Sequence, residues 1–138
     1  MILLDTSGLL AALDEASRLH ARAQRSLHGA NEWILSPLVL AELDYMITAR
    51  LGTRAALELL DDVAAGAYEL ATLTNNDVGA ARVVLDRYSD LDIGLTDASI
   101  VVLAERYDCN RVLTLDERHF RALRTLDGRP FTLLPADA

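Results

Sequence analysis

Four acidic residues stand where a folded domain would bring them together. Asp5 ends the N-terminal apolar run MILL, and Asp116 ends a second apolar run, VLTL. Asp97 opens the predicted helix TDASIVVLAERY, and Glu42 lies in the segment SPLVLAEL, which has helical periodicity. Carboxylates packed together repel one another, whereas Mg²⁺ or Mn²⁺ takes oxygen ligands and keeps waters for chemistry. The four acids therefore predict a site for a hard divalent cation.

Glu42 is the acid that fits a purely structural role least well. In the helix predicted from Pro37, it shares a stripe with Leu38 and Met46, so the pattern predicts a carboxylate in the place of a core residue. Burial of an isolated ionised acid costs several kcal/mol, and the helix has no basic residue before Arg50. We expect a metal ion to compensate this charge.

The other three acids also have structural interpretations. Asp5 begins Asp-Thr-Ser, a run of three good capping side chains, and Asp116 could cap a following helix. Asp97 could complement the dipole of its helix from the first turn. For Asp5 and Asp116 the structural role alone is about as good as a ligand role, and for Asp97 alone the structural role is the better one, so the metal site depends on the joint pattern.

The elements that must position these acids follow from the alternation of short apolar runs with longer segments of helical period. This alternation indicates an α/β domain around a mostly parallel sheet. The predicted strands are 1–4, 33–36, 68–73, 111–116 and 131–135. The predicted helices are 7–27 with a break near 15–17, 37–51, 54–65, 75–88 with Asn75 or Asn76 as cap, and one capped near Thr96. Ligand sites in such sheets lie beyond the carboxyl ends of the strands, where Asp5 and Asp116 would converge if their strands are neighbours.

Length and composition predict one cytoplasmic domain, residues 1–138. Half of the residues are hydrophobic, and no run approaches the length of a membrane span. The single cysteine, Cys109, excludes an intramolecular disulfide and indicates a reducing compartment. All thirteen basic residues are arginine, which excludes a Schiff-base lysine and the lysine of a phosphate-binding P-loop.

The formal net charge of -8 argues against a simple basic surface for nucleic acid. Six arginines nevertheless fall in the last third of the chain near Asp116, and together they predict a phosphate-binding rim: Arg106, Arg111, Arg118, Arg121, Arg124 and Arg129. The three histidines have no metal-ligand spacing. We therefore expect surface or packing roles for His20, His28 and His119.

The segments hhhDTS (h, apolar), SPLVLAEL, LTDASIVVLA and VLTLDERHF occur in the order and spacing of a known family. The chain resembles a PIN-domain ribonuclease, and more closely the VapC-type toxin of a VapBC toxin-antitoxin system. The resemblance implies a PIN-like three-layer α/β/α domain over 1–138, with a central mostly parallel sheet of four to five strands. It assigns catalysis and metal binding to Asp5, Glu42, Asp97 and Asp116. It also implies that Thr6, Ser7 and Thr114 support these acids by hydrogen bonds.

The function implied by the resemblance is that of a toxin endoribonuclease from a type II toxin-antitoxin pair. Such an enzyme uses Mg²⁺ or Mn²⁺ to hydrolyse RNA phosphodiester bonds in a tRNA or ribosomal RNA loop and so inhibits translation. The three aspartates would hold the cation, and Glu42 would coordinate through water or orient the attacking water. The implied partners are a VapB-type antitoxin and a second copy of the chain. DNA would be contacted only indirectly through the antitoxin.

Two other functions stay open at the level of sequence. A non-catalytic PIN-like module could bind RNA or a protein, although an intact acidic quartet argues against it. A haloacid-type phosphatase also has an aspartate after its first strand. Here Ser7 replaces the second aspartate of its DxD motif, and the chain has no lysine, so this function ranks lower.

Overall fold

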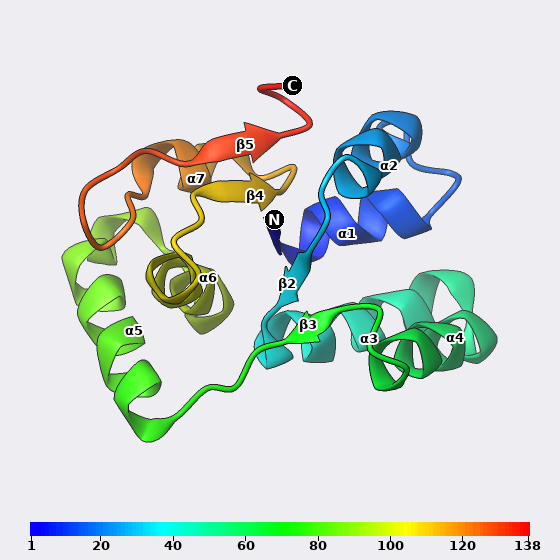
Figure 1. The fold of residues 1–138 in the computed structure, drawn as a ribbon, viewed down its shortest axis with the longest axis horizontal. Coiled ribbons are helices and arrows are strands. Elements are labelled where there is room, and N and C mark those ends of the chain that lie inside the picture. Colours follow the sequence, from blue (N-terminus) through cyan, green and yellow to red (C-terminus); the bar gives the residue numbers. More distant parts are fainter.

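The computed structural model describes residues 1–138, which form one five-stranded parallel sheet flanked by helices (Figure 1). The strand order is β3-β2-β1-β4-β5, and every pairing between neighbours is parallel. The strands are β1 (Ile2–Leu4), β2 (Trp33–Leu35), β3 (Glu69–Leu70), β4 (Arg111–Leu113) and β5 (Thr132–Leu134). This architecture confirms the predicted α/β/α fold class.

Seven α-helices surround the sheet, and their pairs pack in chain order, α1 on α2, α3 on α4 and α5 on α6. The helices are α1 (Thr6–Leu13), α2 (His20–His28), α3 (Pro37–Leu51), α4 (Thr53–Ala64), α5 (Asn75–Arg87), α6 (Leu95–Arg106) and α7 (Glu117–Ala122), and a 3₁₀ turn η1 (Ser89–Leu91) precedes α6. The predicted break between α1 and α2 is confirmed. The predicted strand 68–73 is reduced to the two residues of β3.

Helix starts show where local sequence signals decided the structure and where they misled. Ser36 caps α3 as expected, since its hydroxyl accepts a hydrogen bond from the Leu38 N–H at 3.2 Å. The cap of α5 is Thr74, not Asn75 or Asn76, because Thr74 and Asp77 form a reciprocal capping box. Helix α6 begins at Leu95 rather than near Thr96.

The core lies where the helices pack on the central strands of the sheet. The three central strands are almost entirely buried, and α6 is buried on every side from Ala98 to Ala104. Gly8 lets α1 lie directly on β4, because a Cβ at this position would overlap the Leu113 carbonyl group. None of the helices combines the length and the apolar character that crossing a bilayer requires.

Candidate metal centre

The pairing of β1 with β4 brings the first and last acids to the same edge of the sheet. Leu4 lies opposite Leu113, so both strands end at the same level. The chain leaves β1 at Asp5, whose N–H donates to the Leu113 carbonyl at 3.0 Å, and it leaves β4 towards Asp116. The two apolar runs are therefore neighbouring strands, which meets the condition under which the sequence brings Asp5 and Asp116 together.

Asp5 is a buried carboxylate held by two hydroxyl groups. Only 5% of the residue is exposed. Its Oδ2 accepts hydrogen bonds from Thr114 Oγ1 at 2.6 Å and from Ser7 Oγ at 3.0 Å. Burial raises the pKa of Asp5, the charge of Asp116 raises it further, and the two hydroxyl donors offset only part of this effect. A cation beside Asp5 would favour its ionised form.

Asp97 enters the cluster from the first turn of α6. Its Oδ2 lies 3.4 Å from the Gly94 N–H, which donates to it. Burial raises the pKa of Asp97 to about 6, and the charges of Asp5 and Asp116 add to the rise, while His119 opposes it. The electrostatic coupling of the three aspartates follows from their convergence at one edge of the sheet.

Asp116 and His119 form the exposed side of the cluster at the start of α7. Asp116 Oδ1 caps the helix by accepting the His119 N–H at 3.0 Å. His119 Nδ1 lies 2.9 Å from Asp116 Oδ2 and 3.9 Å from Asp97 Oδ2, yet this buried nitrogen has no aligned hydrogen-bond partner. One potential ligand atom from each of Asp97, Asp116 and His119 lies within 4.8 Å of the others.

The sequence pattern did not place His119 in this cluster, where the structure puts it. The missed signal was its spacing: a residue three positions after a helix-capping aspartate returns to the same side of the first turn. The sequence analysis considered Asp116 as the cap of a following helix but did not follow the consequence of that helix for His119.

The predicted burial of Glu42 is also wrong. The buried stripe of α3 consists of Val39, Leu43 and Ile47, and Glu42 lies beside it on the exposed surface. The carboxylate does have partners, since Oε1 accepts from Thr6 Oγ1 at 2.8 Å and Oε2 accepts from Thr96 Oγ1 at 2.6 Å. Glu42 therefore needs no metal to compensate burial, and it lies outside the compact group of Asp97, Asp116 and His119.

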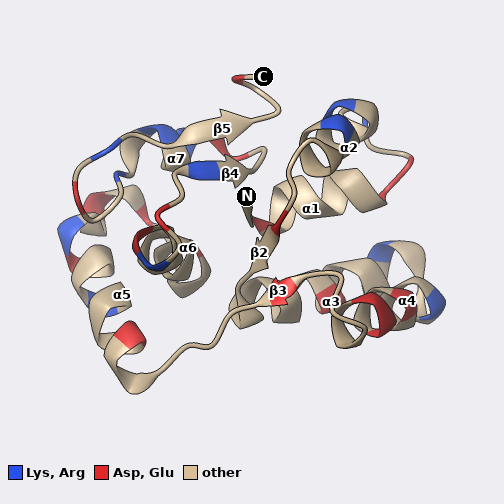
Figure 2. Cartoon of the chain, viewed as in Figure 1, with Lys and Arg blue, Asp and Glu red and all other residues tan.

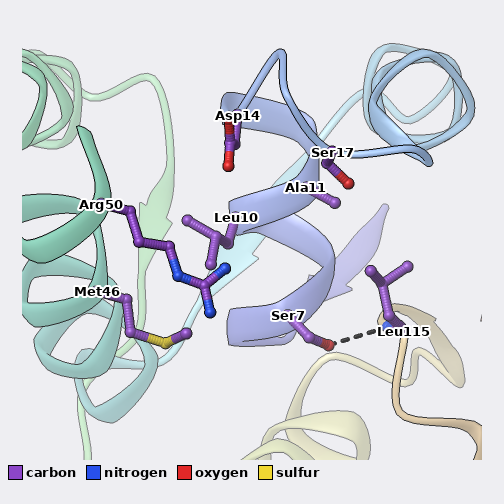
Figure 3. A pocket seen from close by; sticks show the side chains of 8 residues that line it. All are labelled: Ser7, Leu10, Ala11, Asp14, Ser17, Met46, Arg50 and Leu115. Carbon is purple, nitrogen blue, oxygen red and sulfur yellow. Dashed lines mark hydrogen bonds between the residues drawn. The ribbon is translucent and has the colours of Figure 1, made fainter.

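The hydroxyl residues expected around the acids all make contacts with them. Thr6 donates to Glu42, while Ser7 and Thr114 donate to Asp5. Ser7 Oγ also accepts the Leu115 N–H at 2.9 Å, a bond visible in Figure 3. Thr114 Oγ1 accepts the Asp116 N–H at 2.9 Å. These bonds join the start of α1 to the loop after β4 and fix the positions of both acids.

Half of the predicted arginine rim is neutralised by other acids. Ion pairs join Arg106 to Asp77, Arg121 to Glu117 and Asp137, and Arg129 to Asp108 and Asp127. The partners in these pairs come from α5, the end of α6 and the turn after it, α7, the loop that follows α7 and the segment after β5. Figure 2 colours the basic and acidic positions along the chain. The expectation that some of the six arginines bind phosphate stays a prediction, and these three have their charges already compensated.

The donor set suits a hard divalent cation. It offers carboxylate oxygens and one imidazole nitrogen. A bound cation would offset both the free-energy cost of burying these ionised aspartates and their mutual repulsion. No arginine forms an ion pair with any of the four predicted acids, and His119 is the one basic side chain within 4.0 Å of their carboxylate oxygens.

Comparison with known proteins agrees with this geometry. The family model described as PIN domain matches residues 2–126. The chain belongs to the PIN-domain family. Within it, this PIN domain is 42% identical to Ribonuclease VapC26 of Mycobacterium tuberculosis over 135 residues, which are 97% of this chain and all of that protein. The suspected relation to VapC-type ribonucleases is confirmed.

Solved structures of lower identity share the fold of this PIN domain. Mycobacterium tuberculosis VapC20, a toxin that cleaves the sarcin-ricin loop, matches with a TM-score of 0.78 and 19% identity, covering 85% of this chain and 91% of its own. VapBC2 of Rickettsia felis, bound to a promoter DNA fragment, matches with a TM-score of 0.64 and 20% identity. FitAcB of Neisseria gonorrhoeae matches with a TM-score of 0.62 and 20% identity, and both of these matches cover 96% of this chain and 97% of the other.

Proposed function

We propose that this PIN domain is the toxin endoribonuclease of a type II toxin-antitoxin pair and that it hydrolyses RNA phosphodiester bonds with a divalent cation. The observation that carries the proposal is the convergence of Asp5, Asp97 and Asp116 at one edge of the sheet, on a chain 42% identical to a ribonuclease. The pKa values of Asp5 and Asp97 are raised by burial and by the charge of neighbouring aspartates. Groups with such perturbed pKa values cluster at functional sites.

The residues that would hold Mg²⁺ or Mn²⁺ are Asp5, Asp97 and Asp116. When bound, such a cation lowers the pKa of a coordinated water and offsets negative charge that develops on the phosphate. Asp5 is pre-oriented by Ser7 and Thr114, so its carboxylate does not have to be ordered when the cation arrives.

Glu42 has a different part in the proposed mechanism. Its carboxylate is exposed and is fixed at both oxygens by Thr6 and Thr96. From this position it would coordinate the cation through water or orient the attacking water. The hydrogen bonds to two different helices restrict the carboxylate to one orientation, which general-base chemistry requires.

The proposal extends to partners and to the whole chain. We assign a VapB-type antitoxin, a homodimeric assembly and a cytoplasmic location, with RNA of a tRNA or ribosomal loop as substrate. Support for the antitoxin comes from the similar structure of VapBC2, a toxin-antitoxin complex by name. We assign residues 1–138 to one PIN domain. Although β5 lies beyond the residues that the family model matches, it pairs with β4 and so belongs to the same sheet.

An RNA cleavage assay tests the proposal. The wild-type chain should cut RNA in Mn²⁺ or Mg²⁺ and should lose this activity in EDTA or on Asp97→Asn substitution. Asp86→Asn is a matched control, because Asp86 is an exposed acid of α5 without an ion pair. Equal cleavage by the Asp97 and Asp86 variants, or cleavage in EDTA, would contradict the metal-dependent mechanism. RNA binding without cleavage would instead favour the non-catalytic module.

A further inference from the structure

Three arginines line a cleft between α2 and the edge of the sheet. The cleft has a volume of about 250 Å³, and Arg22 and Arg25 from α2 face Arg111 of β4 across it. All three arginines are exposed, and none takes part in an ion pair. On a chain with a net charge of -8, these three guanidinium groups gather positive charge at one cleft. Figure 2 shows the basic positions on α2 and β4.

The geometry of the cleft suits a chain of anionic groups. Arg22 and Arg25 are about one helical turn apart, roughly 4.5 Å along the axis, and so share a face of α2. Arg111 precedes Thr114 by three residues, about 10 Å along an extended strand. Arg22 donates to the Pro135 carbonyl at 3.1 Å, which holds its guanidinium at the cleft while its remaining N–H groups stay available. Guanidinium groups bind phosphate oxygens through paired N–H donors.

The arginine cleft is continuous with the acidic cluster through shared lining residues. Arg22 and Pro135 also line a smaller cavity of about 90 Å³, together with Thr114 and Leu115. Leu115 in turn lines a cavity of about 160 Å³ that contains Ser7 (Figure 3). Ser7 and Thr114 are the two residues whose hydroxyls bind Asp5. Pockets that share lining residues therefore run from the arginines towards the hydroxyl groups that hold Asp5.

We infer that the arginine cleft binds backbone phosphates of the RNA whose scissile bond lies at the acidic cluster. This inference rests on the proposed function and adds the path of the substrate. It also offers a way for an acidic protein to hold a polyanion, because the three cleft arginines form no ion pair and their positive charge is available to phosphates. Only two of the eight lining residues are hydrophobic, which favours a phosphate backbone over an acidic peptide.

The test compares two variants with the same change in net charge. Arg22→Gln/Arg25→Gln/Arg111→Gln alters the cleft, whereas Arg54→Gln/Arg82→Gln/Arg87→Gln alters exposed arginines of α4 and α5. Both are made in the Asp97→Asn chain, so that bound RNA is not cut, and affinity for a fluorescent single-stranded oligoribonucleotide is measured by anisotropy at several salt concentrations.

The cleft variant should bind about tenfold more weakly or worse, and its slope of log affinity against log salt should fall by about 2, since each phosphate contact contributes roughly 0.7. The control variant should keep the parent slope. The double variant Arg25→Gln/Arg111→Gln keeps the bond from Arg22 to Pro135 and should show about two-thirds of the loss in slope. This second variant tests the inference even if the triple variant is unstable.

Failure of the inference can be distinguished from failure of the proposed function. If the Asp97→Asn parent binds RNA and the wild type cuts it, but the cleft variant matches the control variant, the cleft does not carry the RNA and this inference is wrong. An acidic peptide that binds the parent and not the cleft variant would then identify its occupant. If the wild type neither binds nor cuts RNA, the proposed function itself is wrong.

Discussion

The carboxylates of Asp5 and Glu42 are each held by two hydroxyl groups, but in opposite surroundings. Asp5 is buried between β1 and β4 and accepts from Ser7 and Thr114. Glu42 is exposed on α3 and accepts from Thr6 and Thr96. The protein thus uses the same means to orient both acids. Asp5 differs because its ionised carboxylate is also removed from water, which costs folding free energy. At Asp5, therefore, the charge that catalysis needs should lower the stability of the fold.

The largest expected effect belongs to Asp5→Asn. RNA cleavage should fall on the order of a thousandfold, because the substitution removes a ligand oxygen from the proposed metal site. The metal-free protein should instead gain thermal stability at neutral pH. The folded-state pKa of Asp5 is raised, so its ionised form destabilises the fold above the pKa of the unfolded chain. Single-turnover kinetics and thermal denaturation in EDTA measure the two effects.

Glu42→Gln is the matched comparison for Asp5→Asn. It should also reduce cleavage, but the metal-free protein should gain no thermal stability, because Glu42 is exposed and the substitution removes one acceptor oxygen from Thr6 or Thr96. Equal stabilisation by the two substitutions would show that burial does not distinguish the two acids.

Gly8→Ala should be the most destabilising of these substitutions, since the added Cβ would overlap the Leu113 carbonyl and push α1 away from β4. We expect a loss of about 3 kcal/mol in the free energy of unfolding, measured with urea. Gly79→Ala in α5 is the control, because a Cβ there meets open space, and it should stabilise by about 0.5 to 1 kcal/mol. A Gly8→Ala protein as stable as the wild type would contradict the close approach.

Thr114→Val removes the hydroxyl that serves both Asp5 and the Asp116 N–H. Cleavage should fall by about 10 to 100-fold, and the metal-free protein should lose about 1 to 3 kcal/mol of stability. Thr132→Val provides the control on the neighbouring strand, because the Thr132 side chain has no hydrogen bond. Comparable activity of the two variants would indicate that Asp5 needs no orientation by Thr114.

The smallest effect concerns pH. The pKa of Asp97 is about 6 in the folded chain, against 3.8 for an ordinary aspartate, so the folded state binds this proton more tightly than the unfolded state. The metal-free protein should therefore lose stability as pH rises from about 4 to about 6. Asp97→Asn should weaken this dependence, as followed by urea denaturation across the range. A dependence identical to that of the wild type would show that Asp97 is not the titrating group.

The strand-end acids could be predicted from the sequence because two short apolar runs, each ended by an aspartate, are the pattern of central parallel strands. The observed pairing of β1 and β4 places Asp5 and Asp116 accordingly. The burial of Glu42 could not be predicted in the same way. Its stripe neighbours Leu38 and Met46 are themselves only partly buried, and helical periodicity does not fix where the buried face ends.

Ion pairs between residues that are far apart in the chain could not be predicted from local sequence patterns. Arg121 lies 16 residues from Asp137, with which it pairs, and Arg106 lies 29 residues from Asp77. Such pairs form only once helices have packed, so local charge counts overestimated the free arginines near Asp116. His119 joined the cluster for a related reason, because its position depends on a six-residue helix with little periodicity of its own.

The most direct test of metal-dependent RNA cleavage at the acidic edge is to map RNA 5′ ends after brief induction of the wild-type chain and of its Asp5→Ala variant. Both proteins must be shown to be folded and present in equal amounts. We predict one dominant set of ends, in a tRNA or ribosomal RNA loop, that appears only with the wild type. Identical 5′ ends in the two samples would contradict the assignment of ribonuclease activity to this site.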